Sequence, residues 1–265
     1  MPLLAKRILG RADRPVPPVL WELTAPADAS VIAACAAVGA DWFLVPAVVA
    51  TPDIAPIVKS LLGSAKVVVG VTAADLVART RRAEVERIDA LRPLHCAAVM
   101  VQAAEPSEMK SGGPFHRINN LRQQGLTEFV FAEAETVADA EWIIGNSPAH
   151  AVSVPFGIED QTARFRVLAQ AEELGTAILA RRPTESVWEA GEVSRAEDLA
   201  FVLSHPAVAM VIETLPASRE DTTRVLEALS RPAREARRDE IWARFAARVK
   251  EPPKPRGNHP PEYGS

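Results

Sequence analysis

The sequence predicts a single (β/α)8 barrel, the α/β fold in which eight parallel strands are each followed by a helix. Its 265 residues, 48% of them hydrophobic, suit one large core. Short apolar runs typical of strands alternate eight times with longer helical patterns. A doubly wound open sheet can show a similar alternation, but its usual glycine-rich first turn is absent from this sequence. The count of eight therefore favours a closed barrel.

The predicted strands are short runs rich in Val, Ile, Leu, Phe or Ala. The third is the clearest, since it contains four valines between Lys66 and Thr72. Because the active sites of such barrels lie at the carboxyl ends of the strands, any site is expected there. The eight strands are expected at residues 19–23, 41–45, 66–72, 96–102, 128–132, 151–156, 176–181 and 208–213.

The predicted helices carry recognisable start and stop signals. Gly125 and Gly175 each end a helix, and Ser194 with Glu197 three residues later forms a capping box. Residues 105–114 are a polar loop with a Gly-Gly pair. Helices are expected at residues 30–39, 53–62, 76–91, 115–124, 137–144, 160–174, 194–204 and 218–229.

The C-terminal segment differs from the barrel repeats. We assign residues 1–231 to the barrel, 232–250 to an added amphipathic helix and 251–265 to an extended or disordered Pro-rich tail. The helix either packs across the outside or bottom of the barrel or binds a protein partner together with the tail. A homo-oligomer is also open at this stage.

Composition and charge exclude several classes of function. The net charge of −4 gives no basic field for nucleic acid. No apolar run is long enough for a membrane helix, and residues 1–15 do not form a secretory signal. The two cysteines, Cys35 and Cys96, show no metal-ligand spacing and are expected to be buried reduced thiols. We therefore expect a cytoplasmic protein without a metal site.

Several segments resemble the aldo/keto reductase superfamily, in the family's order. Residues 7–11, RILGR, followed by Val16 resemble the hairpin that plugs the barrel bottom, and residues 196–215 resemble the family's seventh helix and eighth strand. The likeness covers about residues 7–230. Further similar stretches are Gly125 with the strand after it, residues 154–156 and residues 172–183. The resemblance implies NADPH-dependent carbonyl reduction by an Asp, Tyr, Lys and His tetrad.

None of the four tetrad residues stands at its position. Leu44 takes the place of the Asp and Val49 that of the Tyr, while the chain's one tyrosine is Tyr263, in the tail. Thr72 takes the place of the Lys, and Gln102 or its neighbour that of the His. Since proton donation to the carbonyl depends on these groups, the resemblance implies a degenerate member with no catalytic residues.

The positions that hold the cofactor in the family are also altered. Glu133 follows strand five where the family has a Ser-Asn pair, and Glu213 at the end of strand eight would repel a pyrophosphate. Phe156 matches the strand whose aromatic stacks on nicotinamide. Arg219 either meets a 2′-phosphate or is solvated at the surface. We expect no cofactor, with weak or absent NADPH binding.

The strand ends bring charged side chains to the barrel mouth. Arg181 or Arg182 is expected to pair with Glu213 or Glu22 across it. Such a pair either binds an anionic ligand or is a structural ion-pair network in the space left by the cofactor. No histidine joins this set. Together, the residues expected to bind a ligand at the mouth are Glu22, Glu133, Phe156, Arg181, Arg182, Glu213 and Arg219.

Three functions remain open from the sequence. The first is a catalytically inactive protein that acts as an accessory, scaffold or sensing subunit, which the loss of the tetrad favours. The second is an enzyme whose Glu and Arg side chains at the mouth act on an anionic small molecule. The third is an NADPH-dependent oxidoreductase working by an unusual route, which requires cofactor binding.

Overall fold

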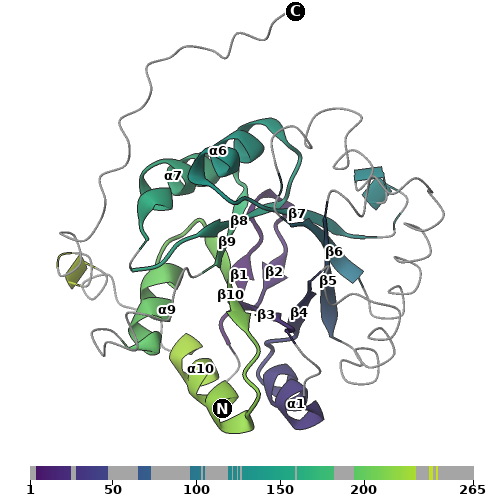
Figure 1. The fold of residues 1–265 in the computed structure, drawn as a ribbon, viewed down its shortest axis with the longest axis vertical. Helices are drawn as coiled ribbons and strands as arrows, with labels where there is room; N and C mark the ends of the chain where they lie inside the picture. Colours follow the sequence, from purple (N-terminus) through teal and green to yellow (C-terminus); the bar gives the residue numbers. More distant parts are fainter. Residues whose placement is uncertain are drawn as a thin grey trace, which may run out of the picture.

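The chain folds into a closed barrel of eight parallel strands, in the order β10-β3-β4-β5-β6-β7-β8-β9 (Figure 1). This computed structural model describes residues 4–24, 28–46, 65–72, 96–102, 104, 119–120, 122–123, 125, 127–158, 160–181, 194–230, 239–240 and 243. The predicted barrel and all eight predicted strands are confirmed. The strands are β3 Val19–Glu22, β4 Trp42–Val45, β5 Lys66–Val71, β6 Cys96–Val101, β7 Phe129–Glu133, β8 Ala151–Pro155, β9 Ala177–Arg181 and β10 Val208–Thr214.

Helices pack on the outside of the strands (Figure 1). Polar side chains cap the N-termini of α1, α6, α9 and α10. The predicted capping box is present, because Ser194 accepts from the Glu197 N–H while the Glu197 carboxylate accepts from the Ser194 N–H. The predicted helix at 160–174 is present from residue 162 and contains a π-helical segment, η4. The helices are α1 Ala29–Ala37, α6 Val137–Asn146, η4 Arg164–Leu168, α7 Ala169–Leu174, α9 Arg195–Leu203 and α10 Arg219–Leu229.

Several predicted elements lie outside the described residues. They are the helices at 53–62 and 76–91, most of the helix at 115–124, nearly all of the C-terminal helix at 232–250, and the tail at 251–265. The domain boundary at residue 231 therefore stays a prediction. Among the helices that the structure describes, none is long and apolar enough to cross a membrane.

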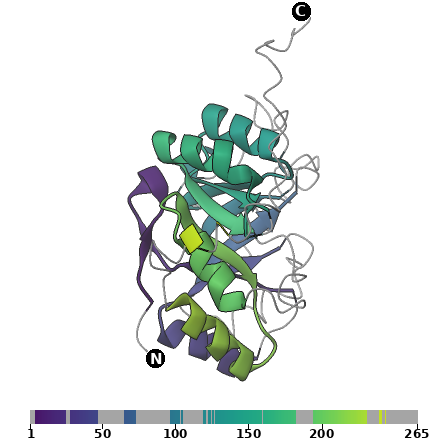
Figure 2. The ribbon, with the colours of Figure 1, turned by 90° about the vertical axis from the view of Figure 1, so that its left-hand side faces the viewer.

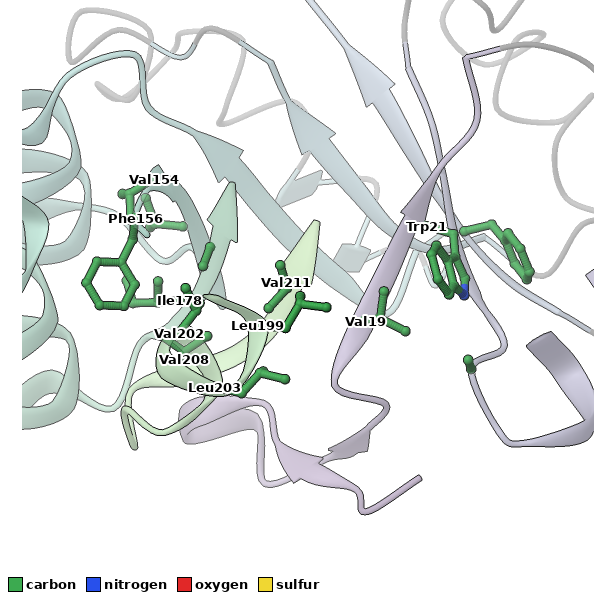
Figure 3. Packing of buried hydrophobic residues seen from close by; sticks show 14 of the residues in the cluster. Val19, Trp21, Val154, Phe156, Ile178, Leu199, Val202, Leu203, Val208 and Val211 are labelled. Carbon is green, nitrogen blue, oxygen red and sulfur yellow. The ribbon is translucent and has the colours of Figure 1, made fainter. Parts of the chain in front are cut away.

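Alternation along each strand divides the core into two clusters. Side chains such as Leu20, Val68 and Leu179 fill the barrel interior. Their neighbours one residue away, such as Val19 and Ile178, pack outward beneath the helices (Figure 3). Because strand side chains alternate with a period of two, this division fixes which residue at each strand end points into the barrel.

An antiparallel hairpin crosses the end of the barrel at which the strands begin (Figure 2). Its Leu9 and Val16 are fully buried in the interior cluster, so the hairpin closes that end. The predicted N-terminal hairpin is thereby confirmed. Its elements are β1 Arg7–Ile8, the short 3₁₀ turn η1 Gly10–Ala12, and β2 Pro15–Val16.

Arg7 fastens the hairpin to the last repeat of the barrel. Its guanidinium donates to three backbone carbonyl oxygens, those of Val208 at 2.7 Å, Leu203 at 2.9 Å and His205 at 3.0 Å. Burial lowers the pKa of Arg7. Leu203 is the last residue of α9, so its carbonyl group has no partner within the helix, and the bond from Arg7 satisfies it.

Candidate functional site

Three strand ends bring charged side chains into the barrel mouth. Glu22, Glu133 and Arg181 each lie two residues beyond an interior side chain on β3, β7 and β9, so all three point inward. These strands are alternate members of the barrel. In such barrels alternate strands supply one layer of inward side chains. The outermost layer is therefore ionic instead of apolar.

Arg181 lies between the two carboxylates of this layer. Its Nη1 donates to Glu22 Oε2 at 2.9 Å and its Nη2 to Glu22 Oε1 at 3.3 Å, a bidentate pair. On the other side, its Nε lies 2.6 Å from Glu133 Oε1. Gln102 Nε2 donates to Glu133 Oε2 at 3.2 Å. We call Glu22, Gln102, Glu133 and Arg181 the mouth network.

The charged groups of the mouth network are partly shielded from solvent. The side chains of Glu22, Glu133 and Arg181 are 15%, 18% and 29% exposed. Burial alone would lower the pKa of Arg181, but hydrogen bonds and charges from Glu22 and Glu133 raise it above its ordinary value. The guanidinium stays charged, and the two carboxylates leave the three groups with a net charge of −1.

The layer beneath the network is apolar except for one hydroxyl. Leu44, Met100 and Ile212 are buried in the interior cluster. Ser153, on β8, faces the same way because Ala151 belongs to that cluster while Val152 and Val154 pack outward. Ser153 is the register partner of Glu133. It is 1% exposed, and among the described residues its hydroxyl has no hydrogen-bond partner.

The structure supports one predicted ion pair and corrects another. The pairing of Arg181 with Glu22 is confirmed. The pairing of Arg181 with Glu213 is wrong, because Ile212 points inward and Glu213 therefore points out of the barrel. The pairing of Arg182 with Glu213 lies outside the described residues and stays a prediction. The Glu213 carboxylate lies 2.5 Å from Arg195 Nη2 at the start of α9, and the Glu213 side chain is 1% exposed. Arg195 carries no sequence motif that would have identified it as the partner.

Phe156 does not face the mouth as the resemblance implied. Val154, two residues earlier, belongs to the outer cluster, and Phe156 follows the same alternation outward (Figure 3). It is 1% exposed and packs against Phe201 and His205, with ring centroids 5.9 Å and 6.3 Å away. The ring is thus buried in the core between barrel and helix, so the expected stacking on nicotinamide was wrong.

The positions matched to the tetrad fall at two depths. Leu44 is fully buried inside the barrel, whereas Thr72 and Gln102 lie at the strand ends and are partly exposed. Val49 lies outside the described residues, as does Arg182. Sequence reasoning placed Gln102 at a strand end, where it replaces the His, and missed its bond to Glu133. It also missed Ser153, whose inward direction follows only from the interior position of Ala151 in the structure.

The described start of α10 is acidic, which disfavours a dinucleotide phosphate at this turn. Arg219 is exposed at the start of α10, but Glu220 and Asp221 follow it in the first turn. Ser218 caps this turn by accepting from the Asp221 N–H. Since carboxylates at a helix N-terminus occupy the place of an anion, this turn disfavours a phosphate. No group of metal-ligating side chains occurs in the part of the chain that the structure describes.

Comparison with solved structures places this fold among the aldo-keto reductases. The holo form of an aldo-keto reductase from Bacillus halodurans is 14% identical, with a TM-score of 0.74 over 94% of this chain and 98% of that one. A thermostable aldo-keto reductase in complex with the inhibitor epalrestat is 14% identical, with a TM-score of 0.72 over 91% and 99%. An aldo/keto reductase from Klebsiella pneumoniae, in complex with NADP and acetate, is 13% identical, with a TM-score of 0.67 over 96% and 98%.

Neither a scan against protein-family models nor a search of curated proteins gave a match. The structural likeness extends over nearly the full length of both chains, and the N-terminal hairpin agrees with it. At these identities the likeness concerns the fold and leaves the chemistry of the mouth to be argued from its own residues. The chain therefore has the fold of the aldo-keto reductases.

Proposed function

We propose that this chain is a degenerate aldo/keto reductase that does not reduce carbonyls and acts as an accessory, scaffold or sensing subunit. The observation that carries the proposal is the mouth network, in which Arg181 is held by Glu22 and Glu133. Charged residues that pair with one another fill the end of the barrel where a substrate carbonyl would have to meet a proton donor.

The chemistry of these groups supports the proposal. Carbonyl reduction needs a hydride and a group that gives up a proton near neutral pH. A guanidinium stays protonated, and the pKa of Arg181 is raised further by its carboxylate partners. Ionised carboxylates only accept hydrogen bonds, and the Gln102 amide does not titrate. Below them, Leu44 offers no charge that would lower the pKa of a phenol or ammonium.

The charge balance also counts against an enzyme acting on an anionic small molecule. Arg181 is the cation on which that alternative depends, and two carboxylates already neutralise it. An incoming anion would have to displace Glu22 or Glu133 and remain beside the other. The anion and the remaining carboxylate would then repel each other strongly, because like charges in a partly shielded site are poorly screened by water.

Cofactor binding gives the direct test. The aldo-keto reductase from Klebsiella pneumoniae is known in complex with NADPH, so the fold itself accommodates the cofactor. Titration of this chain with NADPH, followed by nucleotide fluorescence, is expected to show no saturable change up to millimolar concentration. An active aldo-keto reductase serves as the positive control. Micromolar affinity, or turnover of any aldehyde or ketone with a nicotinamide donor, would contradict the proposal.

The partner-binding part of the proposal rests on residues 232–265. Their amphipathic pattern and Pro-rich end favour an interaction element in a cytoplasmic protein. We expect a chain ending at residue 231 to keep its cooperative unfolding but to change its oligomeric state or lose a co-purifying partner. Light scattering after size exclusion measures the first. If neither changes, the segment is not an interaction element.

A further inference from the structure

We propose that the mouth network, with Ser153 beneath it, binds a small molecule carrying a primary ammonium group. This inference rests on the proposed function in one respect, because a mouth free of nicotinamide is required. It adds the chemical class of the ligand.

The first argument is charge. Glu22 and Glu133 contribute two negative charges and Arg181 one positive charge, so the site is negative by one unit. All three side chains retain exposure of 15–29% at the strand ends. A ligand arriving from solvent therefore meets a shielded negative site, which favours a cation.

The second argument is the balance of hydrogen-bond donors and acceptors. A carboxylate can accept about four hydrogen bonds. Within the described part of the chain, Glu22 accepts two from Arg181, while Glu133 meets Arg181 Nε and the Gln102 amide. About four acceptor positions stay open, against about two unused N–H groups of the guanidinium. An ammonium group has three donors, no acceptor and the charge that the site lacks.

The third argument is Ser153. Its hydroxyl is 1% exposed and faces the barrel interior beside Glu133, its register partner on β7. A buried polar group without a partner in the described structure calls for an explanation, since such groups are nearly always hydrogen-bonded. A donor seated among Glu22, Glu133 and Ser153 would supply that partner. The surrounding Leu44, Met100 and Ile212 would contact the carbon atoms of the ligand.

The probe is n-propylammonium chloride, added to the full chain at constant ionic strength. We expect a saturable rise in Tm and a measurable Kd by calorimetry. Three further compounds serve as controls, and each tests one feature of the proposed ligand. Tetramethylammonium has the charge without N–H donors, propionate has the chain with the opposite charge, and inorganic phosphate tests the anion alternative.

Variants separate binding from folding. Glu133→Gln should abolish binding, and Glu220→Gln, which removes an exposed carboxylate on α10, should leave it unchanged. Ser153→Ala should weaken binding about tenfold, the loss of one hydrogen bond. Because the hydroxyl has no partner in the described structure, this variant should fold normally. If Glu133→Gln fails to fold, the affinity of Ser153→Ala for propylammonium is the deciding measurement.

The outcomes are distinct. Saturable stabilisation by propylammonium, weakened in Ser153→Ala and kept in Glu220→Gln, supports the inference. It is overturned by no saturable effect, by an equal effect of tetramethylammonium, by stabilisation with propionate or phosphate instead, or by unchanged affinity in Ser153→Ala. Absence of propylammonium binding leaves the proposed function standing, whereas saturable NADPH binding refutes the proposed function itself.

Discussion

Replacing Arg181 by methionine tests whether the mouth network stabilises the barrel. Methionine keeps most of the side-chain volume but leaves Glu22 and Glu133 without their cation. Removing one partner of a fully buried ion pair costs about 3–5 kcal/mol, whereas an exposed pair is worth about 0–1 kcal/mol. The three side chains are 15–29% exposed, between these limits but nearer the first. We expect Arg181→Met to lower the free energy of unfolding by about 2–3 kcal/mol.

Urea unfolding of wild type and variants measures this loss, with the m-value as a check on two-state behaviour. The matched control is Arg224→Met, because Arg224 is 68% exposed and pairs with Glu220 and Asp221 within α10. That variant should lose no more than about 0.5 kcal/mol. If Arg181→Met costs no more than the control, the network is a surface feature and the reasoning is wrong.

A triple variant separates the lost cation from the stranded carboxylates. Glu22→Gln, Glu133→Gln and Arg181→Met together remove every charge from the mouth network. Because the penalty comes from unpaired charges, the triple variant should recover to within about 1 kcal/mol of wild type. A triple variant that is less stable than Arg181→Met would show that the side chains matter for packing instead.

Three further predictions concern the rest of the fold. Gly10→Ala should cost at least about 2 kcal/mol in urea unfolding, because its φ is +44° and a Cβ would lie 2.3 Å from the Gly175 carbonyl oxygen; a loss below 1 kcal/mol would contradict this. Burial lowers the pKa of His150, so its neutral form is favoured in the fold and stability should fall as the pH drops below 6.5. His150→Asn should flatten this pH profile, and an unchanged profile would exclude His150 as its origin. Burial raises the pKa of the Cys35 thiol to about 12, so iodoacetamide at pH 8 should modify Cys35 only after unfolding; rapid labelling of the native chain at Cys35, located by peptide mass spectrometry, would refute its burial.

The sequence predicted the barrel well because the fold depends on a repeated local pattern. Each strand is a short apolar run, and α1, α6, α9 and α10 each begin after a polar side chain that caps them, such as Thr136 or Ser218. Counting eight such repeats requires no knowledge of distant contacts. The hairpin was accessible only through the resemblance, since two-residue strands leave no periodic signal.

The site was harder to predict because the direction of a side chain changes with every residue. Glu22 and Arg181 were named at the mouth and do point inward, whereas Glu213 and Phe156 were named there and point outward. The predicted strand ends differ from the observed ones by about one residue. Because side chains alternate along a strand, an error of one residue reverses the direction expected for a side chain. Both faces of these strands are apolar, as in Val19 beside Leu20, so the sequence alone does not show which of two neighbouring side chains faces the interior.

The hydrogen bonds by which Arg7 joins the hairpin to the last repeat have a consequence for biosynthesis. Arg7 is separated by 201 positions from Val208, whose carbonyl oxygen accepts its hydrogen bond. At about 5–20 residues per second, a ribosome needs roughly 10–40 s to make the intervening chain. During that interval Arg7 lacks the Val208 carbonyl group that it binds in the fold, so the hairpin cannot complete its docking on the last repeat. The hairpin therefore reaches its native packing only after the last repeat of the barrel has been made.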